Sequence, residues 1–304
     1  MRYDWKILDA GPLALDGGGM FGVVPKVLWE KITPPDERNR VTLTHNCLLL
    51  TDEAGKHTLI ETGSGGKFDA KMRDIFGLSN RDIRVALHAE NVDPAAIETV
   101  IVTHLHFDHA GGLTHLAGDN EAADWEGHGE RVMRSFPNAK VFVQQQEWDD
   151  ALANRSVMTR TYLPSHLEPI REQVELINTP DPTGDDWPSE EVRPGISLMK
   201  MPGHTWGQQG VRFTDSGGRT VVFVPDVIPT VHHAAPAYSM SYDVEPYTNM
   251  LTRERLLKAA EANDWLLVLD HEPRTPAVRV SRDEKGRAKL TADDSVQVPT
   301  RQES

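Results

Sequence analysis

The segment Val100-Ile101-Val102-Thr103-His104-Leu105-His106-Phe107-Asp108-His109 decides the fold, because three histidines and an aspartate directly follow an apolar run. The apolar run predicts a buried strand. Alternate side chains of an extended chain share a side, so His104 and His106 are expected to point the same way. Asp108 and His109 are adjacent, point in different directions and are available to a second centre. Because imidazole and carboxylate groups suit zinc and neighbouring first-row metals, the segment predicts a metal site at the end of a strand.

Size, charge and cysteine content limit the class of protein. The chain has 304 residues, of which 38% are hydrophobic, and this is enough to bury a sizeable core. A net charge of -14 argues against nucleic acid or an anionic membrane surface as a partner. Residues Met1 to Trp5 are polar and charged without an apolar signal core, and no run approaches the roughly 20 apolar residues of a membrane span, so we expect a cytoplasmic protein. Cys47 is the only cysteine, which excludes an intramolecular disulfide and a zinc cluster built from thiolates.

The order of the expected elements predicts an α/β fold. Both halves of the chain run strands first and helices afterwards, which suggests two mixed sheets packed face to face with helices on the outer faces. No clean linker separates the halves, so we expect one domain over residues 1–280. From residue 281 to residue 304 the composition is polar and charged, which predicts a weakly ordered tail.

Three further candidate ligands, His204, Asp226 and His271, each lie just past a predicted buried strand, as His104 does. The strands that precede them are, in chain order, Ile196–Met201, Val221–Val224 and Trp265–Leu269. A sheet with these strand ends at one edge would gather the side chains in one place.

The motifs THLHFDHAGG, PGHTWGQ, VVFVPD and LDH, in this order, resemble the metallo-β-lactamase superfamily over the chain to about residue 275. The resemblance implies a four-layer αβ/βα sandwich and two divalent metal ions. Zinc is the first expectation, although iron, manganese and cobalt share these ligands. It also implies seven ligands: His104, His106 and His204 for one ion, Asp108, His109 and His271 for the other, and Asp226 as the bridge. Glu61 stands where the family usually has the aspartate of a D-T-G turn.

Three other stretches, Asp16–Lys26, Pro225–Thr230 and Ser241–Asp243, resemble the quorum-quenching N-acyl homoserine lactonase branch. This resemblance predicts a hydrolase that opens a lactone ring by attack of a metal-bridging hydroxide, with Asp108 passing a proton to the leaving alkoxide. The second hypothesis is a phosphotriesterase or arylesterase of the methyl parathion hydrolase type, and the third is a mononuclear iron oxygenase on the same scaffold. The expected partner is a small-molecule lactone or ester, and a homodimer is left open.

The catalytic residues that we expect are Asp108, Asp226 and Tyr242. Pro229 occupies the place where some lactonases of this branch carry a tyrosine that acts in the transition state. Tyr242 either takes over that role or is an ordinary core tyrosine.

Five side chains are expected to contact the substrate: Met20, Phe21, Trp206, His232 and His233. Met20 and Phe21 lie in the glycine-rich apolar stretch Gly17–Pro25, which is poor both as a helix and as a regular strand. This stretch either packs under the fold or forms a mobile lid over a pocket.

Overall fold

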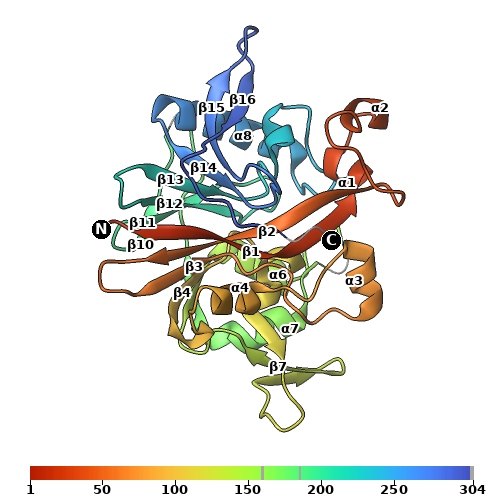
Figure 1. Cartoon of the computed structure of the whole chain (residues 1–304), viewed down its shortest axis with the longest axis vertical. Coiled ribbons are helices and arrows are strands. Elements are labelled where there is room, and N and C mark those ends of the chain that lie inside the picture. Colours follow the sequence, from red (N-terminus) through yellow and green to blue (C-terminus); the bar gives the residue numbers. More distant parts are fainter. Residues whose placement is uncertain (159–160, 185, 302–304) are drawn as a thin grey trace. The chain divides into compact units, whose positions relative to one another are not determined.

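The computed structural model describes residues 1–158, 161–184 and 186–301, and it divides into two compact units (Figure 1). Unit 1 comprises Met1–Arg2, Leu13–Thr44 and Thr179–Val298. Unit 2 comprises Tyr3–Pro12, His45–Asn178 and, among the described residues, 299–301. Sheets and helices occur in both units, which confirms the predicted α/β class. The assignment of residues 1–280 to one hydrolase domain stays a prediction.

The main sheet of unit 2 has the strand order β1-β2-β3-β4-β8-β9, and its strands β1 and β2 continue into unit 1. Strands β3, β4, β8 and β9 are parallel neighbours, whereas β2 is antiparallel to β3. The sheet is therefore mixed, and its parallel strands end at one edge. The bounds are Asp4–Asp16 for β1, Arg40–Thr51 for β2, His57–Ile60 for β3, Ile97–Ile101 for β4, Lys140–Gln144 for β8 and Val174–Ile177 for β9.

Helices pack on this sheet through apolar side chains. Asp82 accepts a hydrogen bond from the Val85 N–H at 3.0 Å and so starts α4, whose Ile83 and Leu87 are completely buried. These side chains share a core with Val100 of β4 and with Trp148 of α6. The helical segments of unit 2 are α3 (Ala70–Phe76), α4 (Ile83–Ala89), η1 (Pro94–Ala96), α5 (Phe107–Ala110), η2 (Gly111–Leu113), α6 (Gln145–Leu152), α7 (Pro164–Leu167) and η3 (Glu168–Gln173).

A small antiparallel sheet, with the strand order β5-β7-β6, is also part of unit 2. Its strands are β5 (Thr114–Leu116), β6 (Trp125–Gly127) and β7 (Glu130–Arg134). It follows directly after η2, so the chain leaves the histidine-rich segment by way of this sheet.

Unit 1 is built on a seven-stranded sheet of order β10 to β16. Only β13 and β14 pair in parallel, and all other neighbours are antiparallel. Strands β11, β13 and β14 consequently run in the same direction and end at the same edge. The bounds are Glu190–Arg193 for β10, Ile196–Lys200 for β11, Gln209–Thr214 for β12, Thr220–Val224 for β13, Leu266–Leu269 for β14, Ala277–Arg282 for β15 and Ala288–Ala292 for β16.

Helix α8 (Pro246–Ala262) lies against this sheet, beside β15 (Figure 1). Its Leu256 and Leu257 are buried in one cluster with Val222 and Leu267 of the sheet. Unit 1 also contains the short helices α1 (Gly17–Phe21), α2 (Lys26–Trp29) and η4 (Val231–Ala234). Within the described residues, no helix has both the length and the apolar composition needed to cross a membrane.

The C-terminal segment differs from the weakly ordered tail expected there. Strand β16 pairs with β15 from Val278↔Ala292 to Arg282↔Ala288, and Arg279 forms an ion pair with Asp293 at 2.9 Å. Leu290 packs against the apolar core of unit 1. A polar sequence thus forms an edge strand because a partner strand and a few apolar contacts are available to it.

Burial of the central strands predicts a clear difference in stability. Leu59 of β3 is completely buried, whereas Leu176 of β9 is 43% exposed. Leu59→Ala is expected to lower the free energy of unfolding by about 2–5 kcal/mol, because it removes core contacts and leaves a cavity. Leu176→Ala is the matched control and should change it by only about 0.5 kcal/mol. Urea unfolding measures both, and equal losses would contradict the packing of β3.

Candidate metal centre

The histidine-rich segment of unit 2 begins where β4 ends and turns into α5 at Phe107. His104 Nε2 lies 3.1 Å from His106 Nδ1, and the rings of His104 and His109 have centroids 3.9 Å apart. Asp108 Oδ1 is 3.9 Å from His109 Nε2. All four side chains are buried. The structure thus brings together the four ligands predicted from this segment.

Glu61 supports this segment although it is one methylene longer than the aspartate usual in the family. It follows β3, the parallel neighbour of β4, and has a positive φ of 69°. One carboxylate oxygen accepts the Thr103 N–H at 2.5 Å, and the other lies 3.2 Å from His109 Nδ1. The longer Glu61 side chain therefore contacts both the Thr103 backbone and the His109 imidazole of the histidine-rich segment.

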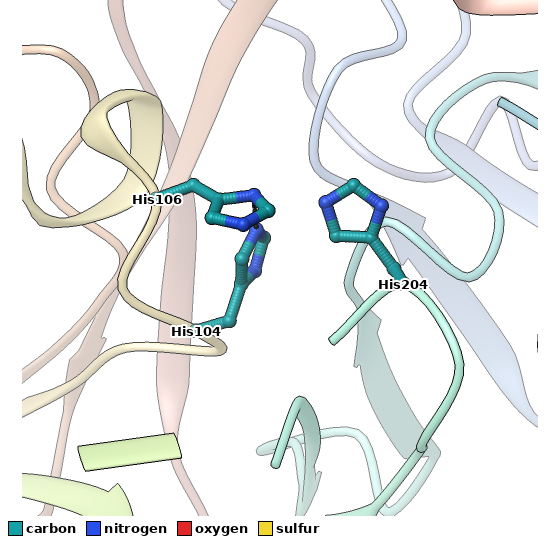
Figure 2. Close-up of side chains that lie close together, drawn as sticks. All are labelled: His104, His106 and His204. Atoms are coloured by element: carbon teal, nitrogen blue, oxygen red, sulfur yellow. Dashed lines mark hydrogen bonds between the residues drawn. The ribbon is translucent and has the colours of Figure 1, made fainter. Parts of the chain in front are cut away.

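Unit 1 gathers the other three predicted ligands at one edge of its sheet. His204 follows β11, Asp226 follows β13 and His271 follows β14, as predicted, and all three are buried. His204 Nε2 lies 3.1 Å from one Asp226 oxygen, and His271 Nε2 lies 3.4 Å from the other. Each oxygen of the Asp226 carboxylate thus faces one imidazole nitrogen. Figure 2 shows the rings of His104 and His106, from the segment after β4, and of His204, from the loop between β11 and β12.

The second nitrogen of each ring shows why this set fits a metal. His271 Nδ1 lies 2.8 Å from the Thr44 carbonyl oxygen, which only accepts, so Nδ1 carries the hydrogen. His204 Nδ1 lies 2.9 Å from the Asp243 carboxylate and is held in the same way. Nε2 of each ring then faces an oxygen of the Asp226 carboxylate, an arrangement that fits a cation held by imidazole and carboxylate together. Imidazoles oriented by a carbonyl and a carboxylate are typical of metal ligands.

Asp270 and Asp243 are site residues that the sequence analysis did not single out. Asp226, Asp270 and His271 each offer a ligand atom within 4.8 Å of the others, and all three are buried. Asp270 Oδ1 also accepts the His271 backbone N–H at 2.9 Å. The signal for Asp270 was its position beside His271 in the LDH motif. The signal for Asp243 was its place in the stretch Ser241–Asp243, but its contact with His204, 39 residues away, could not be read from that stretch.

The glycine-rich stretch that contains Met20 and Phe21 forms the short helix α1 rather than an irregular loop. Asp16 caps it by accepting the Gly19 N–H at 3.0 Å. Phe21 is 2% exposed and stacks on Trp29 and on His233, with ring centroids 5.3 and 5.0 Å apart. These contacts support the packed alternative over the mobile lid.

Four of the five predicted substrate contacts line one cavity of unit 1. Met20, Phe21, His232 and His233 border a space of about 170 Å³. Trp206 is placed differently, since its Nε1–H donates to Glu245 at 3.0 Å. These four residues belong to α1 and η4, although contact with a substrate stays a prediction.

Tyr242 lies against α1. A β-carbon on Gly19 would approach the Tyr242 hydroxyl oxygen to 2.0 Å, so the phenol rests directly on the Gly19 backbone. This contact explains why Gly19 has no side chain. A catalytic role for Tyr242 stays a prediction, as do those of Asp108 and Asp226.

Comparison with known proteins identifies the family. The model of the metallo-β-lactamase superfamily matches residues 40–271, and the chain belongs to this superfamily. It is similar to the N-acyl homoserine lactonase AiiA of Bacillus thuringiensis subsp. kurstaki, with 32% identity over 119 residues. That match covers 39% of this chain and 34% of the relative, so the chain matches about a third of the relative's length.

Solved structures extend the similarity to nearly the whole chain. A probable metal-dependent hydrolase from Staphylococcus aureus has a TM-score of 0.80 and 27% identity, covering 97% of this chain and 99% of the other. AidC, described as a dizinc quorum-quenching lactonase, has a TM-score of 0.72 and 16% identity, covering 96% and 98%. These similarities confirm the predicted sandwich fold, and the sequence match to AiiA confirms the resemblance to the lactonase branch.

The buried ring of His233 predicts an acid-sensitive fold. Burial lowers the pKa of His233 to about 3, while the Met20 carbonyl that it contacts at 2.9 Å acts in the opposite direction. The unfolded chain, with a histidine pKa near 6.5, then binds more protons than the folded chain as the pH falls from about 6.5 towards 3. Acidification from pH 7 to pH 5 should therefore remove about 2 kcal/mol of stability through this group.

Urea unfolding of chelator-treated protein at pH 7 and pH 5 measures this loss. His233→Gln should not show this loss of stability between pH 7 and pH 5, whereas His88→Gln, at an exposed position, should show the same loss as the wild type. The same pH dependence in wild-type protein and in His233→Gln would show that another group is responsible.

Proposed function

We propose that this protein is a metal-dependent hydrolase that opens N-acyl homoserine lactones. The observation that carries the proposal is the Asp226 carboxylate, whose two oxygens face Nε2 of His204 and of His271. The Nδ1 atoms of both rings are held by other acceptors, so the pair of nitrogens is available to cations. Membership of the metallo-β-lactamase superfamily supports the same chemistry.

The site that we propose is dinuclear. His104, His106 and His204 would hold one divalent ion, and Asp108, His109 and His271 the other. Asp226 would bridge them, in keeping with its two carboxylate oxygens serving two different imidazoles. Zinc is the first candidate, because AidC is described as a dizinc enzyme and the ligands are imidazoles and carboxylates.

When bound, two such ions would lower the pKa of water to about 7 and would polarise an ester carbonyl. Asp108, 7% exposed at the start of α5, is the proposed group that passes a proton to the alkoxide that leaves. A lactone suits this arrangement, because the alkoxide remains tethered to the product. Buried surroundings strengthen each electrostatic contact by excluding water.

The substrate class rests on the lactonase relatives and on the cavity of unit 1. Met20, Phe21, Val41 and Leu43 give this cavity an apolar side that suits an acyl chain. His232 and Glu272 add polar groups at its border. The partner that we propose is therefore a small amphipathic lactone. We also propose that the protein is cytoplasmic.

A substrate panel tests the activity. Zinc-loaded protein should release protons with N-acyl homoserine lactones, because ring opening forms a carboxylic acid, and a pH indicator measures this release. An aryl phosphotriester supplied in parallel should be turned over more slowly. Absence of turnover for lactones of every chain length would overturn the lactonase assignment, and faster turnover of the phosphotriester would replace it with a phosphotriesterase.

Metal content tests the bridging role of Asp226. Asp226→Ala should lower the bound zinc at both positions, whereas His271→Ala should empty mainly one, and elemental analysis after dialysis measures the two. Asp215→Ala, at a buried aspartate that pairs with Arg219 in the β12–β13 hairpin, is the control and should retain the wild-type content. Unchanged metal content in Asp226→Ala would contradict the bridge.

A further inference from the structure

A buried carboxylate on α6 reaches the backbone between His104 and His106. Glu147 follows β8, the parallel neighbour of β4 on the side opposite β3, and it is completely buried. Its Oε1 accepts the Leu105 N–H at 2.9 Å and the Tyr162 hydroxyl at 3.3 Å. Glu147 thus binds the peptide group between His104 and Leu105.

Burial of a carboxylate at this position calls for an explanation. Taking an ionised carboxylate out of water is strongly unfavourable unless it is well paired, and an apolar residue on the buried face of α6 would avoid this loss. The Leu105 amide and the Tyr162 hydroxyl are both neutral donors. Burial and the nearby Glu147 carboxylate raise the pKa of Tyr162, so its hydroxyl keeps the proton that it donates.

The two contacts act on the histidines in different ways. The peptide group is planar, so fixing the Leu105 N–H also fixes the carbonyl group of His104, which belongs to the same plane. The Tyr162 ring packs against the His106 ring, with centroids 5.2 Å apart. Glu61, just after β3, accepts the Thr103 N–H, so alternate amides of the segment are bound by carboxylates from the segments that follow β3 and β8.

We propose that Glu147 is a positioning residue for the metal centre, which fixes the His104-Leu105-His106 backbone and adds negative charge that favours cations at these imidazoles. The inference rests on the proposed metal site and names a residue that would support it without touching the metal. It assigns to Tyr162 the lesser role of orienting the Glu147 carboxylate.

The helix itself offers a matched control. Asp150 is also a buried carboxylate on α6, but its oxygens accept from Arg155 at 2.7 Å and from Gln146 at 2.7 Å, within the helix and the residues that follow it. Glu147→Gln and Asp150→Asn remove one buried charge each and preserve the shape of the side chain. Only Glu147→Gln changes a side chain that binds the backbone of the histidine-rich segment.

The experiment compares zinc affinity and the cobalt absorption spectrum in wild-type protein, Glu147→Gln, Tyr162→Phe and Asp150→Asn. Competition with a chromophoric chelator should show a 10- to 100-fold weaker zinc Kd for Glu147→Gln, the size typical of losing a partner that orients metal ligands. The visible bands of bound cobalt should shift in the same variant, because they report ligand geometry. Tyr162→Phe should show a smaller effect, and Asp150→Asn should match the wild type.

Thermal melting of the metal-free proteins separates positioning from general stability. The proposal expects Glu147→Gln and Asp150→Asn to melt at similar temperatures and to differ in zinc affinity. Wild-type affinity and an unchanged cobalt spectrum in Glu147→Gln would overturn it. If Glu147→Gln does not fold, Tyr162→Phe replaces it in the comparison, and a wild-type zinc Kd in that variant would overturn the proposal. Failure of the wild-type chain to bind zinc would instead overturn the proposed function.

Discussion

The proposed metal chemistry depends on one arrangement: the two oxygens of the Asp226 carboxylate each lie close to Nε2 of a histidine, His204 or His271. Carbonyl and carboxylate acceptors face Nδ1 of His271 and of His204, and Nε2 of each ring faces an oxygen of Asp226. Buried ionisable groups that converge in this way are paired with one another or coordinate a metal. The polar groups at this edge of unit 1 therefore fit a cation.

In unit 2 the candidate ligands are held in place through their backbone, by carboxylates that accept hydrogen bonds from it. The segment from Thr103 to His106 is irregular, so its amides are outside the strand ladder and need other acceptors. Glu61, just after β3, and Glu147, in the helix that follows β8, supply them from the two sides of β4. Parallel pairing makes this possible, because the ends of β3, β4 and β8 meet at one edge. The same carboxylates hold the backbone and add negative charge.

The α1 segment shows how packing takes the place of intrinsic helix propensity. Three consecutive glycines disfavour a helix, yet Asp16 caps the turn, and Phe21 is held between Trp29 and His233. A β-carbon on Gly17 would lie 2.3 Å from the Trp29 ring, so the small residue is required by the close approach of an aromatic side chain. Composition alone suggested a loop, because the stacking of Phe21 on His233 joins parts of the chain that are far apart in the sequence.

The sequence by itself determined the α/β class and the seven candidate ligands, because each ligand lies just past an apolar run that reads as a buried strand. It also indicated the family, through motifs in a fixed order. Only the tertiary structure decided that Asp243 and Thr44 orient the ring nitrogens, that Asp270 joins the ligand group and that Glu147 holds Leu105. The polar segment of β16 likewise became a strand only through its pairing with β15. Asp243, Thr44 and Glu147 lie far along the chain from the residues that they contact, and a partner at such a distance leaves no periodicity or spacing in the local sequence.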